Sequence, residues 1–416
     1  MITSSFQSRA PFWLLVFTLL VFLPVRCLSA ASIGSTFTIA NTTNKETALG
    51  LAFDGTNFLV GLKGDAVAPD SIVAQLVSPS GTLVGTLITT GHFGGTPRLG
   101  FDGTNYLMVW QDCDVPCNND LFGMFVSPAG SAVATAFNIS GTVQEVGGLA
   151  TDGSDYLVVY FNEDSRVYGR LVSTGGTVGA EISISSGFGG FAINNVAFDG
   201  TNYLVVWVDD TNDTEVRGRF VSSTGTLGTE FSINASSFHS DNVASVIFDG
   251  TNYLVVWEDQ VGGYPDGEWD LFAQLLDTSG AAVGGVIPVS TATGSQHMPA
   301  AAFDGKDFLV AWTDMRNDLD DDFICDVGEG TCLDIRGQFL SQSGSLLGPE
   351  FTINEDPGNQ FVSPVAFGAS KYIVVWTSGD EIEGTVGDVF GSMILNNIFA
   401  DGFESGNTSA WSSSVP

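Results

Sequence analysis

The chain predicts an all-β fold built from seven repeated units, and three observations support this. The ten residues Phe248-Asp-Gly-Thr-Asn-Tyr-Leu-Val-Val-Trp257 recur in near copies that begin at Phe53, Phe101, Thr151, Phe198, Phe248, Phe303 and Phe367. The starts lie roughly 47 to 64 residues apart, a spacing typical of four-stranded propeller blades. No unit has the periodicity of a helix. We therefore expect a seven-bladed β-propeller.

The strands of one unit can be assigned in order between Val196 and Asn234. The first strand ends at Asp199-Gly200, a dipeptide typical of a tight hairpin turn, and the second returns as Tyr203 to Trp207. A third strand from Val216 to Val221 and a fourth from Gly228 to Asn234 follow, joined by a Ser-Ser-Thr-Gly turn. Because the second strand is apolar on both faces, we expect neighbouring blades to cover it on both sides.

The two ends of the repeat array predict a closed ring. A fourth-strand pattern, Ser35-Thr-Phe-Thr-Ile-Ala-Asn, precedes the first unit, and the last unit stops after its third strand at Val389-Phe-Gly-Ser-Met-Ile. We expect the N-terminal strand to complete the last blade, because closure protects strand edges that an open array would expose.

The N-terminus predicts a cleaved secretory signal. Arg9 precedes an apolar run of about 15 residues, from Pro11 to Val25, which is too short to span a bilayer, and small residues follow at positions 29–31. A lipid anchor at Cys27 is the less favoured alternative, because Arg26 does not fit a lipobox. We therefore expect a signal peptide at 1-31, the propeller at 32-396, a C-terminal tail at 397-416, and a destination outside the cell, on its surface or in a periplasm.

Four cysteines remain after such a signal, and they form two close pairs: Cys113 with Cys117, and Cys325 with Cys332. An even number in an exported chain favours disulfides. A zinc site would need both pairs to meet across the array, and no histidine lies at ligand spacing. We expect two local disulfides.

The charge balance limits the partners. Aspartate and glutamate number 47 against 13 lysines and arginines, which gives a formal net charge of −34. Such a surface repels phosphate backbones, so neither nucleic acid nor an anionic membrane is expected as a partner. Divalent cations, cationic proteins and neutral glycans remain open, as does a role in solubility in a salty environment.

The sixth unit contains the most acidic loop, from Asp314 to Asp334. Calcium prefers six to eight oxygen ligands and would relieve the repulsion among these carboxylates. The candidate ligands are Asp314, Asn317, Asp318, Asp320 and Asp322. The loop is not an EF-hand, since the required glycine and final glutamate are missing, and a solvated acidic loop is the alternative.

Four further sets of residues recur or stand out. The aspartates of the Asp-Gly turns are expected to accept turn N–H groups: Asp54, Asp102, Asp152, Asp199, Asp249 and Asp304. The aromatic residues that end the second strands are expected to pack between blades: Trp110, Tyr160, Trp207, Trp257, Trp312 and Trp376. Smaller acidic sets follow the second strands: Asp112, Asp114 and Asp120; Asp209, Asp210 and Asp213; Asp259, Asp266 and Asp270. The histidines His92, His239 and His297 are expected in connectors that enter first strands. Their offsets from the next Asp-Gly differ, which favours independent positions over a shared metal or base site.

The recurring unit, with its Arg-Gly-Arg-Phe-Val-Ser and Gly-Thr-Glu-Phe-Ser-Ile strands, resembles repeats of secreted bacterial proteins of mostly unassigned function. The resemblance covers about residues 35 to 396, and the ending from Ile398 to Trp411 is similar to short tails of exported bacterial proteins. It implies a secreted β-propeller and supplies no catalytic residues.

The strand order separates two faces. The first-to-second and third-to-fourth turns lie on one face, which we call the turn face; the second-to-third loops and the connectors lie on the other, the irregular face. Because irregular loops on a rigid scaffold usually carry binding, we expect a secreted, monomeric, non-catalytic recognition or adhesion propeller that binds a neutral glycan or protein surface there. The alternatives are an extracellular polysaccharide hydrolase or lyase that uses an acid such as Asp210 with His239, and a calcium-binding structural surface protein.

Overall fold

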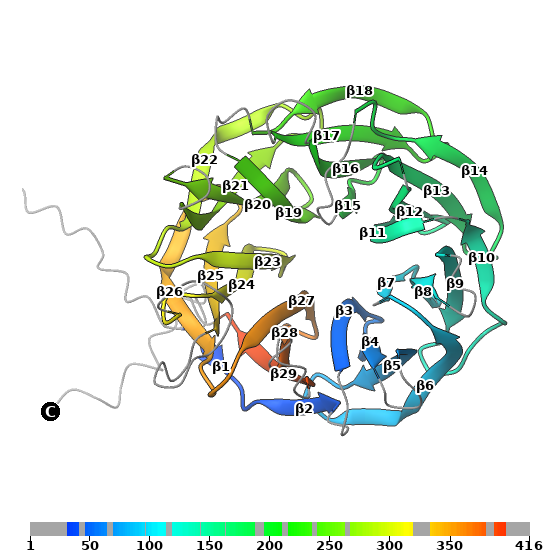
Figure 1. Cartoon of the computed structure of the whole chain (residues 1–416), viewed down its shortest axis with the longest axis horizontal. Helices are drawn as coiled ribbons and strands as arrows, with labels where there is room; N and C mark the ends of the chain where they lie inside the picture. Colours follow the sequence, from blue (N-terminus) through cyan, green and yellow to red (C-terminus); the bar gives the residue numbers. More distant parts are fainter. Residues whose placement is uncertain are drawn as a thin grey trace, which may run out of the picture.

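The computed structural model describes residues 31–40, 46–64, 70–95, 97–113, 119–141, 143–162, 164–187, 195–209, 215–234, 239–262, 267–318, 333–379 and 387–396. Their strands form seven antiparallel sheets arranged around a central axis (Figure 1). The prediction of a seven-bladed β-propeller is confirmed. The part of the chain that is described holds no helix with the length and hydrophobicity needed to cross a membrane. The predicted signal peptide and tail lie outside the described residues, apart from Ala31.

Within each blade the strands follow one another from the innermost to the outermost. The strands are β3 (Glu46–Phe53), β4 (Phe58–Gly64), β5 (Ser71–Val77) and β6 (Leu83–Phe93) in blade 1; β7 (Arg98–Phe101), β8 (Tyr106–Asp112), β9 (Asp120–Val126) and β10 (Phe137–Ser140) in blade 2; β11 (Val143–Thr151), β12 (Asp155–Asn162), β13 (Val167–Ser173) and β14 (Val178–Ser183) in blade 3; β15 (Asn195–Phe198), β16 (Asn202–Asp209), β17 (Glu215–Ser222) and β18 (Leu227–Ser232) in blade 4; β19 (His239–Phe248), β20 (Tyr253–Val261), β21 (Glu268–Leu276) and β22 (Ala282–Ser290) in blade 5; β23 (Gln296–Phe303), β24 (Asp307–Asp314), β25 (Asp334–Ser341) and β26 (Leu346–Asn354) in blade 6; and β27 (Gln360–Gly368), β28 (Lys371–Ser378) and β29 (Asp388–Leu395) in blade 7.

The ring closes as the sequence predicts. The N-terminal strand β2 (Phe37–Ala40) pairs antiparallel with β29, with Thr38 opposite Phe390. Ile39 is 4% exposed and packs in a cluster shared by blades 7 and 1. A second N-terminal strand, β1 (Ser32–Ile33), pairs with the other end of β29, so the last blade is held by two segments from the start of the chain.

The hydrophobic core is divided among the blade interfaces, because each second strand is covered on both faces. One cluster joins Val206 of β16 to Trp257 of β20, for example, and therefore holds blade 4 against blade 5. The tryptophans that end second strands are at most 1% exposed, which confirms their packing role. Removing any one blade would therefore expose two apolar surfaces.

The recurring tyrosine of the repeat connects one blade to the next. In five blades the phenol at the start of the second strand donates a hydrogen bond to a turn carbonyl of the preceding blade: Tyr106 to Asn57 (3.1 Å), Tyr156 to Asn105 (3.1 Å), Tyr203 to Asp155 (3.0 Å), Tyr253 to Asn202 (3.3 Å) and Tyr372 to Asp307 (2.7 Å). Blades 1 and 6 have Phe58 and Phe308 at this position. The turn face is thus tied together by side chains that the repeat itself encodes.

Candidate functional site

Much of the irregular face lies outside the described residues. Cys117, Cys325 and Cys332 are among the residues not described, as are Asp320 and Asp322. Cys113 directly follows β8, and its backbone N–H donates to the carbonyl of Phe93 at 2.8 Å. The two disulfides and the full calcium ligand set therefore stay predictions.

Asp314, one of the predicted calcium ligands, ends β24 and has no exposed surface. Its Oδ2 accepts hydrogen bonds from Trp312 Nε1 at 2.9 Å and from the Arg316 guanidinium at 2.7 Å. Arg336 Nε lies 3.7 Å from Asp314 Oδ1, and both arginines also reach Glu350. Two guanidinium groups thus already compensate this carboxylate, so a calcium ion would have to displace them in order to bind it.

The other described members of that predicted set are engaged within the protein. Asn317 Nδ2 donates to Asp334 Oδ2 at 2.8 Å, and Asp318 is 6% exposed. Burial raises the pKa of Asp334 to about 6, opposed by the nearby Arg336. Among the described residues, no group of three or more His, Cys, Asp and Glu side chains could hold a metal ion. Calcium binding remains a prediction for the whole loop.

The smaller acidic sets contain carboxylates that face each other across neighbouring strands. The second and third strands of four blades carry directly opposed acids: Asp112 with Asp120, Asp209 with Glu215, Asp259 with Asp270, and Asp314 with Asp334. In blade 4, Arg217 binds both members, at 2.9 Å from Asp209 and 3.0 Å from Glu215. In blade 5, burial raises the pKa of Asp270 to about 6, with smaller contributions from Glu268 and Asp259.

The expected placement of the histidines in connectors is wrong. His92 lies in the outermost strand β6, and His239 and His297 lie in the innermost strands β19 and β23. His92 Nδ1 is 3.3 Å from Asp112 Oδ1, whereas His297 Nδ1 is 2.9 Å from Glu258 Oε2. His92 and His297 therefore each lie beside a different carboxylate, and His297 is buried rather than on the surface.

The aspartates of the turn face have the structural role expected of them. Asp249 Oδ1 accepts the backbone N–H groups of Thr251 and Asn252, both at 2.7 Å. The same pair of bonds is made at the other turns by Asp54, Asp102, Asp152, Asp199 and Asp304. These residues build the scaffold and are not candidates for a site.

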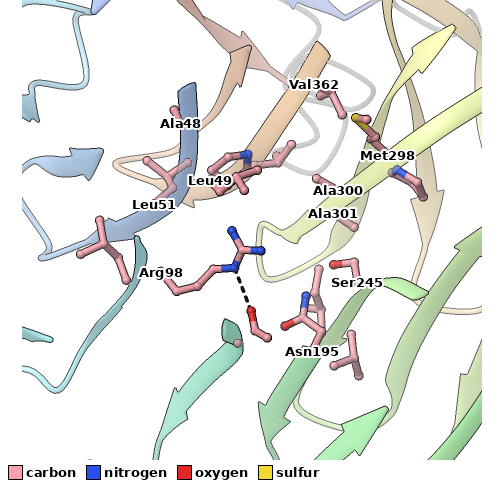
Figure 2. A pocket seen from close by; sticks show the side chains of 18 of the residues that line it. Ala48, Leu49, Leu51, Arg98, Asn195, Ser245, Met298, Ala300, Ala301 and Val362 are labelled. Atoms are coloured by element: carbon pink, nitrogen blue, oxygen red, sulfur yellow. Dashed lines mark hydrogen bonds between the residues drawn. The ribbon is translucent and has the colours of Figure 1, made fainter. Parts of the chain in front are cut away.

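A cavity of about 570 Å³ lies where the seven innermost strands converge (Figure 2). Its wall is largely apolar and includes Leu49, Leu99, Leu149, Val246 and Val362. On each innermost strand, the lining residues precede the recurring aromatic position and its Asp-Gly turn. The cavity therefore lies toward the irregular face, and its volume is in the range of small-molecule sites.

One position of the repeat forms a ring within this cavity. The residues three before the recurring aromatic position are Gly50, Arg98, Gly148, Asn195, Ser245, Ala300 and Pro364, and all but Gly50 line the cavity. Six of the seven side chains are short and uncharged, and one is a long cation. Arg98 is not among the site residues predicted from the sequence, although an alignment of the seven units would reveal it.

Arg98 starts β7 and extends its guanidinium toward the middle of the cavity (Figure 2). Its Nε donates a hydrogen bond to the carbonyl of Gly147 in the next blade, at 2.8 Å. That carbonyl lies where the register of β11 shifts between Val146 and Leu149. Burial lowers the pKa of Arg98, opposed by the charge of Glu145, but an arginine in a protein stays protonated. Among the described residues, no carboxylate oxygen lies within 4.0 Å of the guanidinium.

A second polar group lies on the opposite wall. Glu258 is 1% exposed, and its Oε1 accepts the N–H of Met298 at 2.6 Å while its Oε2 contacts His297. Met298 has a φ of 53° and a 45% exposed side chain, so its backbone adopts a left-handed conformation that non-glycine residues rarely take. A histidine oriented by a buried carboxylate is an arrangement that general bases use.

The comparisons with known proteins concern the fold. No protein-family model and no curated protein matches the chain. The structure is similar to the β-propeller domain of the Trilobed protease from Pyrococcus furiosus, described as having an open velcro topology, with 11% identity, a TM-score of 0.50 and coverage of 84% of this chain and 95% of that one. It is also similar to a protein of unknown function from Dyadobacter fermentans, with 12% identity, a TM-score of 0.51 and coverage of 88% and 99%. At these identities the likeness shows one thing, that the chain is a β-propeller.

Proposed function

We propose that the chain is an exported, non-catalytic recognition module that binds a neutral glycan or a protein surface through its irregular face. The observation that carries this proposal is the axial cavity, because it opens a concave, largely apolar site on the side of the irregular loops. A protruding group of the ligand would enter the cavity while the loops contact the surface around it.

The electrostatics of the chain narrow the choice of ligand. With a formal net charge of −34, the surface opposes a phosphate or sulfate polymer at long range. A neutral glycan experiences no such repulsion, and a cationic protein surface is attracted. Calcium bound by the loop that contains Asp318, Asp320 and Asp322 would assist contact with sugar hydroxyls, although Asp314 is held by arginines.

The second candidate function is an extracellular polysaccharide hydrolase or lyase. The contact between His297 and Glu258 favours it, because this pair lies beside the cavity and resembles the base and its orienting group. The exposed, left-handed Met298 next to it is the kind of backbone strain that active sites often retain.

Binding and turnover can be tested on one panel of neutral glycans and soluble polysaccharides. We expect wild type to bind without shortening any chain, and Ala300→Trp, which fills the cavity, to lose binding. Ala129→Trp on an exposed turn of the opposite face is the matched control and should bind like wild type. Chain cleavage that disappears in His297→Ala would show that the protein is an enzyme, and full binding by Ala300→Trp would remove the cavity from the site.

A further inference from the structure

We propose that Arg98 forms an anion subsite in the axial cavity, and that this subsite takes a small organic monocarboxylate with an apolar body. The inference goes beyond the proposed function, because it concerns a different ligand class, although both ligands would use the axial cavity. It rests on the space around Arg98, on the partners of its guanidinium and on the apolar wall.

The repeat itself makes the space for a ligand. At the ring position the other lining residues are Gly148, Asn195, Ser245, Ala300 and Pro364, so no second long side chain enters from this level. Arg98 therefore projects into a chamber of about 570 Å³. A side chain needed only to fill a core would meet opposing side chains, whereas Arg98 meets open volume.

Among the described residues, the guanidinium is held by a backbone carbonyl and contacts no carboxylate directly. Its Nε donates a hydrogen bond to the carbonyl of Gly147, which fixes the plane of the guanidinium. The two terminal nitrogens lie on the side away from that carbonyl (Figure 2). A carboxylate can accept one hydrogen bond from each of two guanidinium nitrogens, which is the geometry that arginine favours. The other charged residue among the described ones that line the cavity, Glu258, accepts the N–H of Met298 and contacts His297.

The surroundings favour one negative charge on an apolar ligand. Leu49, Leu99, Leu149 and Val246 would contact the body of the ligand, and the single cation matches a single carboxylate. The many surface carboxylates do not exclude such a ligand, because exposed charges are screened beyond about 8 Å at physiological ionic strength. Inside the cavity the attraction to Arg98 is several times stronger than in bulk water.

Glu145 is near enough to Arg98 for the two charges to interact, although it is not one of the residues that line the cavity. Burial raises its pKa, the charge of Arg98 opposes that shift, and the two groups therefore interact without an ion pair at 4.0 Å. A ligand carboxylate would be repelled by Glu145 while it is attracted by Arg98. Removing the charge of Glu145 should therefore strengthen binding, which a purely structural arginine would not predict.

The test compares phenylacetate and decanoate with their neutral amides by calorimetry on the purified full chain. We expect wild type to bind at least one carboxylate about tenfold more tightly than its amide. Arg98→Met, which keeps the apolar length of the side chain, should abolish that preference, and Glu145→Gln should raise carboxylate affinity several-fold.

Equal binding of acid and amide by wild type, or an unchanged preference in Arg98→Met, would overturn the proposal. Absence of heat with every probe up to about 10 mM would do the same. If Arg98→Met does not fold, Ala300→Trp tests the site by filling it while Arg98 remains, and carboxylate binding should then be lost. Glycan or protein binding that survives in Arg98→Met would show that the irregular-face function is separate.

Discussion

The two faces of the propeller hold their carboxylates in different ways. On the turn face, Asp199 and its equivalents accept two backbone N–H groups each, within three residues of sequence. On the irregular face, acids oppose one another across strands, as Asp209 and Glu215 do around Arg217. Backbone N–H groups of the same turn satisfy the carboxylates of the turn face, whereas the opposed carboxylates of the irregular face depend on charged side chains. Neutralising a single charge should therefore destabilise the irregular face more than the turn face.

The largest expected effect comes from removing the charge of Asp314. Asp314→Asn removes the charge of one of the two described acids that form ion pairs with both Arg316 and Arg336, and breaking a buried pair of this kind costs about 3 to 5 kcal/mol. Urea denaturation measures the change in the free energy of unfolding. The matched variant Asp199→Asn keeps an acceptor for both N–H groups and should cost less than about 1 kcal/mol. Equal costs would mean that the two faces do not differ in this way.

A smaller loss is expected when a turn aspartate loses its acceptor altogether. Asp199→Ala leaves the N–H groups of Thr201 and Asn202 without their shared partner, which should cost about 1 to 3 kcal/mol. The cost should not change between low and high salt, because no ion pair is involved. A cost that falls as salt is added would show that the turn relies on charge.

The phenol bonds between blades should contribute less. Tyr253→Phe removes the bond to the carbonyl of Asn202 and should lower the free energy of unfolding by about 1 kcal/mol. Blade 6 offers the reverse control, since Phe308 occupies the same position. Phe308→Tyr should recover part of such a bond, and destabilisation by that variant would show that the position is too tight for a phenol.

The smallest effect, and the one of opposite sign, concerns Asp270. Its pKa in the folded protein is about 6, above the ordinary value of 3.8, so the folded state binds the proton more tightly than the unfolded state. The contribution of Asp270 to the free energy of unfolding therefore falls as the pH rises from about 4 through 6. Asp270→Asn should be more stable than wild type by about 0.5 to 1 kcal/mol at pH 7.5, and the difference should vanish near pH 3.5. Thermal unfolding at both pH values checks this, and a pH-independent difference would rule it out.

The sequence was most informative where a pattern repeats. The recurring Asp-Gly turn and the doubly apolar second strand predict the blades, and the pattern around Phe37 predicts the closure. The histidines were misplaced because strand ends depend on pairing: β6 continues past a register shift to Phe93, which carries His92 into the sheet. The strand β1 was not predicted, because its two residues, Ser32 and Ile33, are too few to show the alternation of apolar and polar side chains that indicates a strand.

Arg98 could not be assigned from its own unit for a related reason. Within one unit, Pro-Arg-Leu-Gly is an ordinary beginning of a strand, and its partner carbonyl at Gly147 lies in the next blade. The position acquires meaning only when seven equivalent strands meet around one axis. The charged sets were found but not their pairing, since Arg217 and Arg336 reach acids on a neighbouring strand.

The closure of blade 7 has a consequence for how the protein is made. A ribosome produces β2 before any complete blade, yet its partner β29 is the last of the propeller strands described to emerge. Until then blade 7 lacks its outer strand, and the apolar face of blade 1 that packs against blade 7 stays uncovered. The entropic cost of joining the ends is modest, because it grows by only about 0.6 kcal/mol for each doubling of the intervening length. The delay is kinetic, because the ring can lock only after β29 has been synthesised.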